Sequence, residues 1–152
     1  DAQYGVEKGM TSLAAGLAGG NLIYESSGMT ASLLGASFEA FILDDEMHAH
    51  TYRTLRGVEV SEANLGFDDI CQAVLGEGHF LGGDQTLAAM ERDYYYPPLA
   101  DRDDPGVWGA SGAPTAWDRA KLKARSVLDS HRPQYLTPEQ DAEIRRRFNI
   151  IL

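Results

Sequence analysis

The sequence predicts an α/β fold: the C-terminal segment of a (β/α)8 TIM-type barrel with extra C-terminal helices, mostly helical when taken alone. Helical periodicity recurs along most of the chain, whereas only residues 21–25 have the pattern of a buried strand. A helix, a glycine stop, this strand and another helix follow one another as in one period of a parallel α/β protein. The chain has 152 residues, fewer than the roughly 250 of a complete barrel, so we expect an incomplete one.

The first part of the chain supplies this helix–strand–helix unit. Residues 5–18 carry apolar side chains at helical spacing with small residues opposite, and two glycines end the helix. Residues 21–25, NLIYE, form a short apolar run between glycine-rich and serine-rich turns, which is typical of a buried strand. Residues 31–56 predict the longest helix, where Asp45 and His48 interrupt the apolar face three residues apart. If buried, these two side chains are expected to satisfy each other.

The following stretch alternates short helices with loops. Residues 58–66 predict a short strand or a loop, and residues 67–75 predict a short helix that ends at a glycine. A glycine-rich loop, GEGHFLGG, covers residues 76–83. A helix is expected over residues 84–93, capped by Asp84 and followed by three tyrosines and two prolines.

We divide the chain into three segments. Residues 1–100 are expected to be the last βα units of the barrel. Residues 101–116 are rich in Asp, Gly, Pro and Ala and predict a loop or tether. Residues 117–152 are expected to hold the C-terminal helices, the first from about residue 115 to 130. The second begins at Thr137, where a cap, a first-turn proline and a carboxylate follow one another.

Charge and cysteine content limit the function classes. The net charge of −10 disfavours binding to nucleic acid or to an anionic membrane surface. The apolar runs are much shorter than the ~20 residues that span a bilayer. The one cysteine, Cys71, can form no internal disulfide, which suits a reducing cytoplasm. The chain opens on Asp1 instead of Met, which favours a trimmed start or a segment cut from a longer protein.

Several motifs together resemble one protein family. They are YGVEKG with LAAGLAGGNLIYE, FEAFILDDEM with TLRGVEV, and GEGHFLGGDQTL with LADRDDPGVWGASGA, and they extend to about Leu136. GHFLG beside the QTL helix is the most specific. The chain resembles the C-terminal portion of the trimethylamine methyltransferase family, the corrinoid-dependent methylamine and glycine betaine methyltransferases.

The resemblance implies a methyl transfer from a methylated amine, a quaternary amine such as glycine betaine or else trimethylamine. The acceptor would be the Co(I) of a corrinoid (cobalamin) carried by a small separate corrinoid protein, in cytoplasmic C1 metabolism. Family members resemble (β/α)8 barrels, so this chain would be an incomplete enzyme. Some members contain pyrrolysine and this chain has none, so the branch of its parent stays open. We expect a quaternary amine, because it leaves more readily and this chain offers no obvious activating group.

Candidate substrate-binding residues come from two places. Glu25 stands at the C-terminal end of the predicted strand, which in barrels faces the active site. Its carboxylate could hold a quaternary ammonium, with Tyr24 supplying a cation–π contact. Asp1, Gln3 and Tyr4 precede the first helix and would share that face if a barrel strand ends just before them. The alternative is that Glu25 is an ordinary solvated loop residue.

The glycine-rich loop supplies the candidate corrinoid-facing residues. His79 and Phe80 could touch the corrinoid or shape the pocket, and the alternative is a structural loop. Tyr94, Tyr95 and Tyr96 could form an aromatic cage for a methylammonium group. Adjacent residues point in different directions, however, so we expect packing at the helix end instead.

Neither a metal site nor a catalytic residue is assigned. Asp44 with His48, and Glu46 with His50, are ligand types spaced i,i+4, but the two pairs fall on different faces of the helix. A polar face is therefore the better explanation. The competing function is a non-catalytic helical oligomerisation fragment. A partial barrel exposes apolar edges that must pair or aggregate, so a homo-oligomer is expected in either case.

Overall fold

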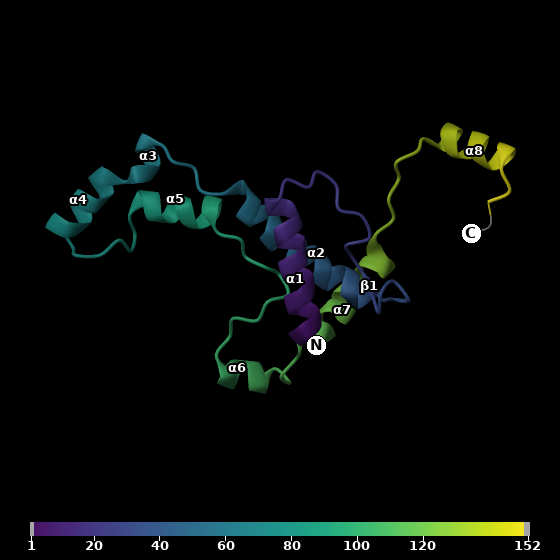
Figure 1. Cartoon of the computed structure of the whole chain (residues 1–152), viewed down its shortest axis with the longest axis horizontal. Helices are drawn as coiled ribbons and strands as arrows, with labels where there is room; N and C mark the ends of the chain where they lie inside the picture. The colour runs from purple at the N-terminus through teal and green to yellow at the C-terminus, as the bar shows by residue number, and fades with distance from the viewer. Residues whose placement is uncertain (1, 151–152) are drawn as a thin grey trace.

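The computed structural model describes residues 2–150 and consists mainly of helices (Figure 1). One small hairpin is the sheet found in this range. The elements in chain order are α1 (Ala2–Leu17), β1 (Met29–Thr30), β2 (Gly35–Ala36), α2 (Phe38–Arg56), α3 (Glu62–Leu65), α4 (Phe67–Leu75), α5 (Asp84–Asp93), α6 (Pro105–Ala110), α7 (Ala116–Ser130) and α8 (Pro138–Arg147).

The core lies where α2 packs against α1 and α7 (Figure 1). We call α1, α2 and α7 the three-helix unit. Its buried apolar residues include Ala40 on α2 with Ala120 and Ala124 on α7. Because these side chains are small, α2 and α7 approach closely. The segment before α6 is held to both helices, since Glu46 accepts from Leu99 N at 2.5 Å and Arg119 donates to Leu99 O at 2.6 Å.

Helix α1 matches the predicted helix, but the face that it buries is the small one. Ser12 is 8% exposed, and a Cβ at Gly16 would lie 2.8 Å from Leu55 Cδ1 of α2. A side chain at this position would therefore push the two helices apart. The apolar side chains on the other side of α1 are exposed, namely Val6, Met10 and Leu17.

The predicted strand at residues 21–25 is wrong for this chain. These residues are irregular, and Leu22 is 87% exposed and Tyr24 79% exposed. A buried strand needs neighbouring strands to pair with, and the described residues place none beside it. The strands that do form are β1 and β2, an antiparallel pair in which Met29 faces Ala36.

The predicted helix over residues 31–56 begins later, at Phe38. Ala31, Ser32 and Leu33 all have positive φ, a conformation incompatible with a right-handed helix. They form the turn between β1 and β2. Ser37 then caps α2 by accepting a hydrogen bond from Ala40 N at 3.0 Å.

Helices α3, α4 and α5 form an arm that extends from the end of α2 (Figure 1). Its boundaries follow the sequence prediction, except that α3 occupies part of the predicted strand or loop and Gly83, not Asp84, caps α5. Two side chains of α2 join it to the arm: Arg53 donates to Asp93 O, and Arg56 donates to Arg92 O at 2.5 Å.

The C-terminal third contains one helix that the pattern did not predict. Residues 101–116 include α6, which begins because Asp104 accepts hydrogen bonds from Gly106 N and Val107 N. The two predicted terminal helices are present as α7 and α8. Each begins with a capping box, at Thr115 and at Thr137.

The surface of the chain is large for its mass. Its accessible area is 12151 Å², whereas a compact monomer of 16.6 kDa exposes roughly 7,600 Å². Much of the excess is apolar, because large side chains on α1, α4 and the connecting segments are exposed. No helix among residues 2–150 is both long and apolar enough to cross a bilayer.

Candidate functional site

A buried carboxylate joins α1, α2 and the turn before β1. Asp44 of α2 is 1% exposed. Its Oδ1 accepts a hydrogen bond from the Tyr4 hydroxyl at 2.8 Å, and its Oδ2 accepts from Lys8 Nζ at 2.5 Å and from Gly28 N at 2.7 Å. We call these four residues the Asp44 joint. Three donors from two further segments satisfy this carboxylate, so it can stay charged while buried.

Tyr4 is a neutral donor within the Asp44 joint. Burial raises the pKa of its hydroxyl well above the usual value, and the hydrogen bond to Asp44 and the charge of Asp44 raise it further. The ammonium of Lys8 lies 5.1 Å from the centre of the Tyr4 ring, a distance at which cation–π attraction operates. The ring of Tyr4 therefore already contacts one cationic group.

The predicted substrate-binding residues lie near this joint. Glu25 precedes Gly28 by three residues, so chain geometry keeps their Cα atoms within roughly 11 Å. Gly28 and Tyr4 both contact Asp44. Asp44 thus joins Tyr4 to Gly28, which lies three residues after Glu25.

The side chains of the other predicted residues are mostly open to solvent. Tyr24 is 79% exposed, and Glu25 is exposed with a φ of 58°. Gln3 is exposed and donates to Glu7 Oε1 at 2.8 Å within α1. Asp1 lies outside the described residues.

The glycine-rich loop folds back on the end of α4 and forms a shallow pocket of about 300 Å³. Its lining includes both predicted corrinoid-facing residues, His79 and Phe80, together with Leu81. His79 Nε2 lies 3.4 Å from Glu77 Oε2. Phe80 is 50% exposed, so a molecule that approaches from outside could touch its ring.

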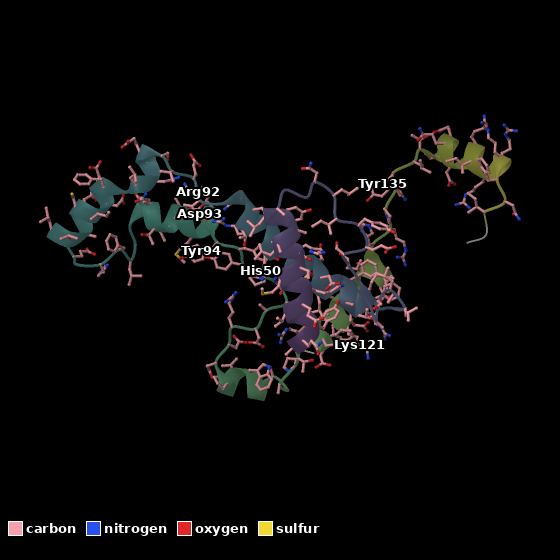
Figure 2. The ribbon with its side chains drawn as sticks, viewed as in Figure 1. His50, Arg92, Asp93, Tyr94, Lys121 and Tyr135 are labelled. Carbon is pink, nitrogen blue, oxygen red and sulfur yellow. The ribbon has the colours of Figure 1, made fainter. Side chains whose placement is uncertain are left out.

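The middle one of the three consecutive tyrosines packs away from the other two. Tyr95 packs edge-to-face on His50 of α2, with ring centres 4.8 Å apart, and burial raises the pKa of its hydroxyl. Tyr94 and Tyr96 stack on each other at 6.2 Å instead. Figure 2 shows Tyr94 in the segment that leads from the arm back toward the three-helix unit. No single cage is formed by all three.

The predicted pairing of Asp45 with His48 is wrong. Asp45 is exposed, and His48 Nε2 is buried without a hydrogen-bond partner among residues 2–150. The buried carboxylate of this helix is its neighbour Asp44, because a one-residue shift rotates a side chain by about 100° around the helix. Within the described part of the chain, no three His, Cys, Asp or Glu side chains gather closely enough to hold a metal ion.

Sequence reasoning missed Lys8 and the buried role of Asp44. A signal for Lys8 was present, since Tyr4 and Lys8 are spaced i,i+4 and share one face of α1. The partner of that face lies 36 residues away from Lys8. Local spacing alone does not identify such a partner.

Comparison with known proteins identifies the family of this chain. The family model for trimethylamine methyltransferase matches residues 1–149. The chain belongs to the trimethylamine methyltransferase family. The glycine betaine methyltransferase of Desulfitobacterium hafniense strain Y51 is 33% identical over 144 residues, which cover 95% of this chain and 30% of that protein.

Two further members of this family are similar to this chain. Trimethylamine methyltransferase MttB of Methanosarcina barkeri strain Fusaro is 33% identical over 153 residues, covering 100% of this chain and 29% of the relative. MttB1 of Methanosarcina acetivorans is 35% identical over 133 residues, covering 86% of this chain and 26% of the relative. The chain therefore spans less than a third of the length of these curated relatives.

Proposed function

We propose that this chain forms the C-terminal part of a methyltransferase that removes a methyl group from a methylated amine, a quaternary amine such as glycine betaine or else trimethylamine. The observation that carries the proposal is the family match over residues 1–149. We further propose that the part belongs to a (β/α)8 barrel, works in the cytoplasm and acts with a small corrinoid protein. When bound, the corrinoid supplies Co(I), the nucleophile that takes the methyl group while the C–N bond electrons stay with the amine.

The residues near the Asp44 joint are suited to a methylated ammonium group. In this proposal the Glu25 carboxylate attracts the cation and the exposed ring of Tyr24 contacts its methyl groups. The hydrogen bond from Gly28 N to Asp44 Oδ2 holds Gly28 in place, and so limits how far Glu25, three residues earlier, can move. Tyr4 remains protonated, and its ring lies beside the Lys8 ammonium. Tyr4 is therefore better placed to position the segment than to bind the substrate directly.

The pocket of the glycine-rich loop fits a contact with a corrinoid carried by another protein. It is shallow, and Phe80 and Leu81 offer apolar surface beside the His79 imidazole. Such a surface can cover one side of a large ring but cannot enclose it. His79 and Phe80 would thus exclude water from the edge of the cofactor and orient the partner.

Complementation tests this proposal. The purified chain is mixed with the part of the D. hafniense glycine betaine methyltransferase that has no counterpart here, together with reduced cob(I)alamin and glycine betaine or trimethylamine. We expect demethylated amine, measured by NMR, only when both polypeptides are present. Glu25→Gln should lower the rate about tenfold, because it removes the charge that holds the cation, and Glu59→Gln is the matched control. No product from either amine, while the full-length relative works in the same buffer, would contradict the proposal.

A second candidate function is a helical oligomerisation module. The apolar side of α1 is exposed, with Val6 at 62%, Met10 at 68% and Leu17 at 64%, and the spacing of these residues forms one stripe. A stable dimer buries about 800 Å² on each partner. The excess surface of this chain is several times larger, so a second copy could cover the stripe.

The oligomeric state tests this second candidate. Sedimentation velocity over a hundredfold range of concentration should show a dimer that Met10→Glu dissociates, whereas Glu7→Gln on the same helix leaves it intact. A monomer at every concentration rules out self-association through α1.

A further inference from the structure

Charge is distributed very unevenly along this chain. Residues 1–118 contain 5 Lys or Arg and 19 Asp or Glu, whereas residues 119–150 contain 8 Lys or Arg and 4 Asp or Glu. The side chains therefore give the first segment a net charge of −14 and the second a net charge of +4. Surfaces of opposite potential attract each other, and complementary charge decides which surfaces meet.

The arm is a strongly acidic part of the first segment. Residues 62–93, which form it, contain seven Asp or Glu and one Arg. Among residues 2–150, only Asp93 and Glu77 of these acids lie within ion-pair distance of a basic side chain. The arm also exposes apolar side chains of α4, since Phe67 is 72% exposed and Val74 is 68% exposed. The acids without an ion pair are Glu62, Asp68, Asp69, Asp84 and Glu91.

Helix α7 carries a basic surface in the second segment. Lys121, Leu122 and Arg125 are exposed, and their spacing places them within about 100° of the helix circumference. We call these three residues the α7 basic face (Figure 2 labels Lys121). Ala120 and Ala124 are buried on the opposite part of the helix. Neither Lys121 nor Arg125 forms an ion pair within the part of the chain that the structure describes.

We propose that the α7 basic face binds the arm of a second copy of this chain. The two cations face carboxylates of the arm that have no ion pair, and Leu122, which is 71% exposed, meets the exposed apolar side chains of α4. Figure 1 shows the arm projecting away from the three-helix unit, so the arm of one copy is accessible to α7 of the next. This contact is independent of the methyl-transfer chemistry and of association through α1.

Sedimentation velocity at 20 mM and 500 mM salt gives the first test. We expect self-association at low salt that becomes about tenfold weaker at high salt, because salt screens exposed charges. Association through the apolar stripe of α1 would behave differently, since Met10→Glu would abolish it and salt would not weaken it. A monomer at 20 mM salt, or association of equal strength at both salt concentrations, overturns the proposal.

Reversal of the charges on each surface gives the sharper test. The arm variant combines Asp68→Lys with Glu91→Lys, and the α7 variant combines Lys121→Glu with Arg125→Glu. Each variant alone should lose the salt-sensitive association, because like charges then face each other. An equimolar mixture should recover it, because the reversed arm of one variant meets the reversed α7 face of the other. A mixture that stays dissociated overturns the proposal.

A matched control separates this contact from an effect of net charge. Asp45→Lys with Asp103→Lys changes the net charge as much as the arm variant does, but both residues are exposed outside the arm and α7. This control should associate like the unmodified chain. Far-ultraviolet circular dichroism checks that every variant is folded. If the control loses association to the same extent as the arm variant, overall charge governs self-association and the contact between the arm and α7 is wrong.

Discussion

Two carboxylates of this chain have similar numbers of hydrogen bonds and very different surroundings. Asp44, in the Asp44 joint, accepts from Tyr4, Lys8 and Gly28 and is 1% exposed. Glu143 of α8 also accepts three hydrogen bonds, but its side chain is 42% exposed. Figure 1 shows α8 lying away from the three-helix unit.

From this difference we expect burial and sequence separation, not the number of hydrogen bonds, to determine what each carboxylate contributes to stability. The partners of Asp44 lie 16 to 40 residues away, so its bonds form only when the chain has folded. Glu143 bonds to Arg146 and Arg147, three and four residues along the same helix. Water competes for those bonds in the folded protein as it does in the unfolded chain.

The largest expected effect is that of removing Asp44. Asp44→Ala leaves Lys8 and Gly28 N without their partner in a buried place, and should lower the free energy of unfolding by about 3 kcal/mol. Urea denaturation followed by circular dichroism measures this change. The matched control is Asp45→Ala on the exposed side of the same helix, which should stay within about 0.5 kcal/mol of the unmodified protein. Equal effects of the two substitutions would show that the joint does not stabilise the fold.

The next effect concerns the close contact between α2 and α7. Ala120 is 0% exposed, so Ala120→Leu should force the helices apart and cost about 2 kcal/mol. Lys121→Leu adds a leucine at the next residue of α7, which is exposed (Figure 2). Thermal unfolding should separate these two leucine variants by more than 5 °C for a domain of this size, using roughly 4 °C per kcal/mol. Similar melting temperatures of the two variants would mean that α2 and α7 can separate enough to accommodate a leucine at residue 120 without loss of stability.

The ends of most helices could be predicted from the sequence, because caps are local. Ser61, Thr115 and Thr137 each accept a hydrogen bond from a backbone N–H three residues later, and a motif of four residues suffices to indicate this. The prediction of a strand at residues 21–25 failed because strand formation is not local. A strand exists only through its neighbours, and the apolar run of Leu22 and Ile23 is also suited to line an open hollow.

The candidate site was only partly predictable for the same reason. Tyr4 and Glu25 were selected from their position and residue type, but nothing local indicated that Asp44 bonds to Tyr4 and to Gly28, three residues after Glu25. Periodicity favoured Asp45 as the buried residue, since it continues the apolar stripe of α2. The structure buries Asp44 because α1 contributes Tyr4 and Lys8 on that side, and packing of distant segments overrides local pattern.

A smaller effect should appear at alkaline pH, through Tyr4. Its pKa is raised in the folded protein above the ordinary 10.0, so the stability that its neutral form contributes is fully present below pH 10 and is lost as pH rises toward the folded pKa. Tyr4→Phe cannot ionise and should make stability decline less steeply above pH 10. Urea denaturation from pH 8 to 11 measures the slope. The control is Tyr135→Phe, at the 87% exposed residue before α8, which Figure 2 shows on the connecting segment. A slope unchanged by Tyr4→Phe would contradict the raised pKa.

The smallest effect should come from the exposed carboxylate of the opening comparison. Glu143→Gln removes the ion pairs with Arg146 and Arg147, yet the folded and unfolded chains both leave these groups in water, so the melting temperature should not change measurably. What should change is the helicity of α8 at low salt, because the pairs at i,i+3 and i,i+4 support the isolated helix. Circular dichroism at 10 mM and 500 mM salt separates the exposed ion pairs of Glu143 from the buried bonds of Asp44. Screening should erase the difference between Glu143→Gln and the unmodified chain, whereas the effect of Asp44→Ala should persist at both concentrations because water and ions do not reach a carboxylate that is 1% exposed. If high salt also abolished the Asp44→Ala effect, Asp44 and Glu143 would differ in degree only, and burial would not be the cause of the difference.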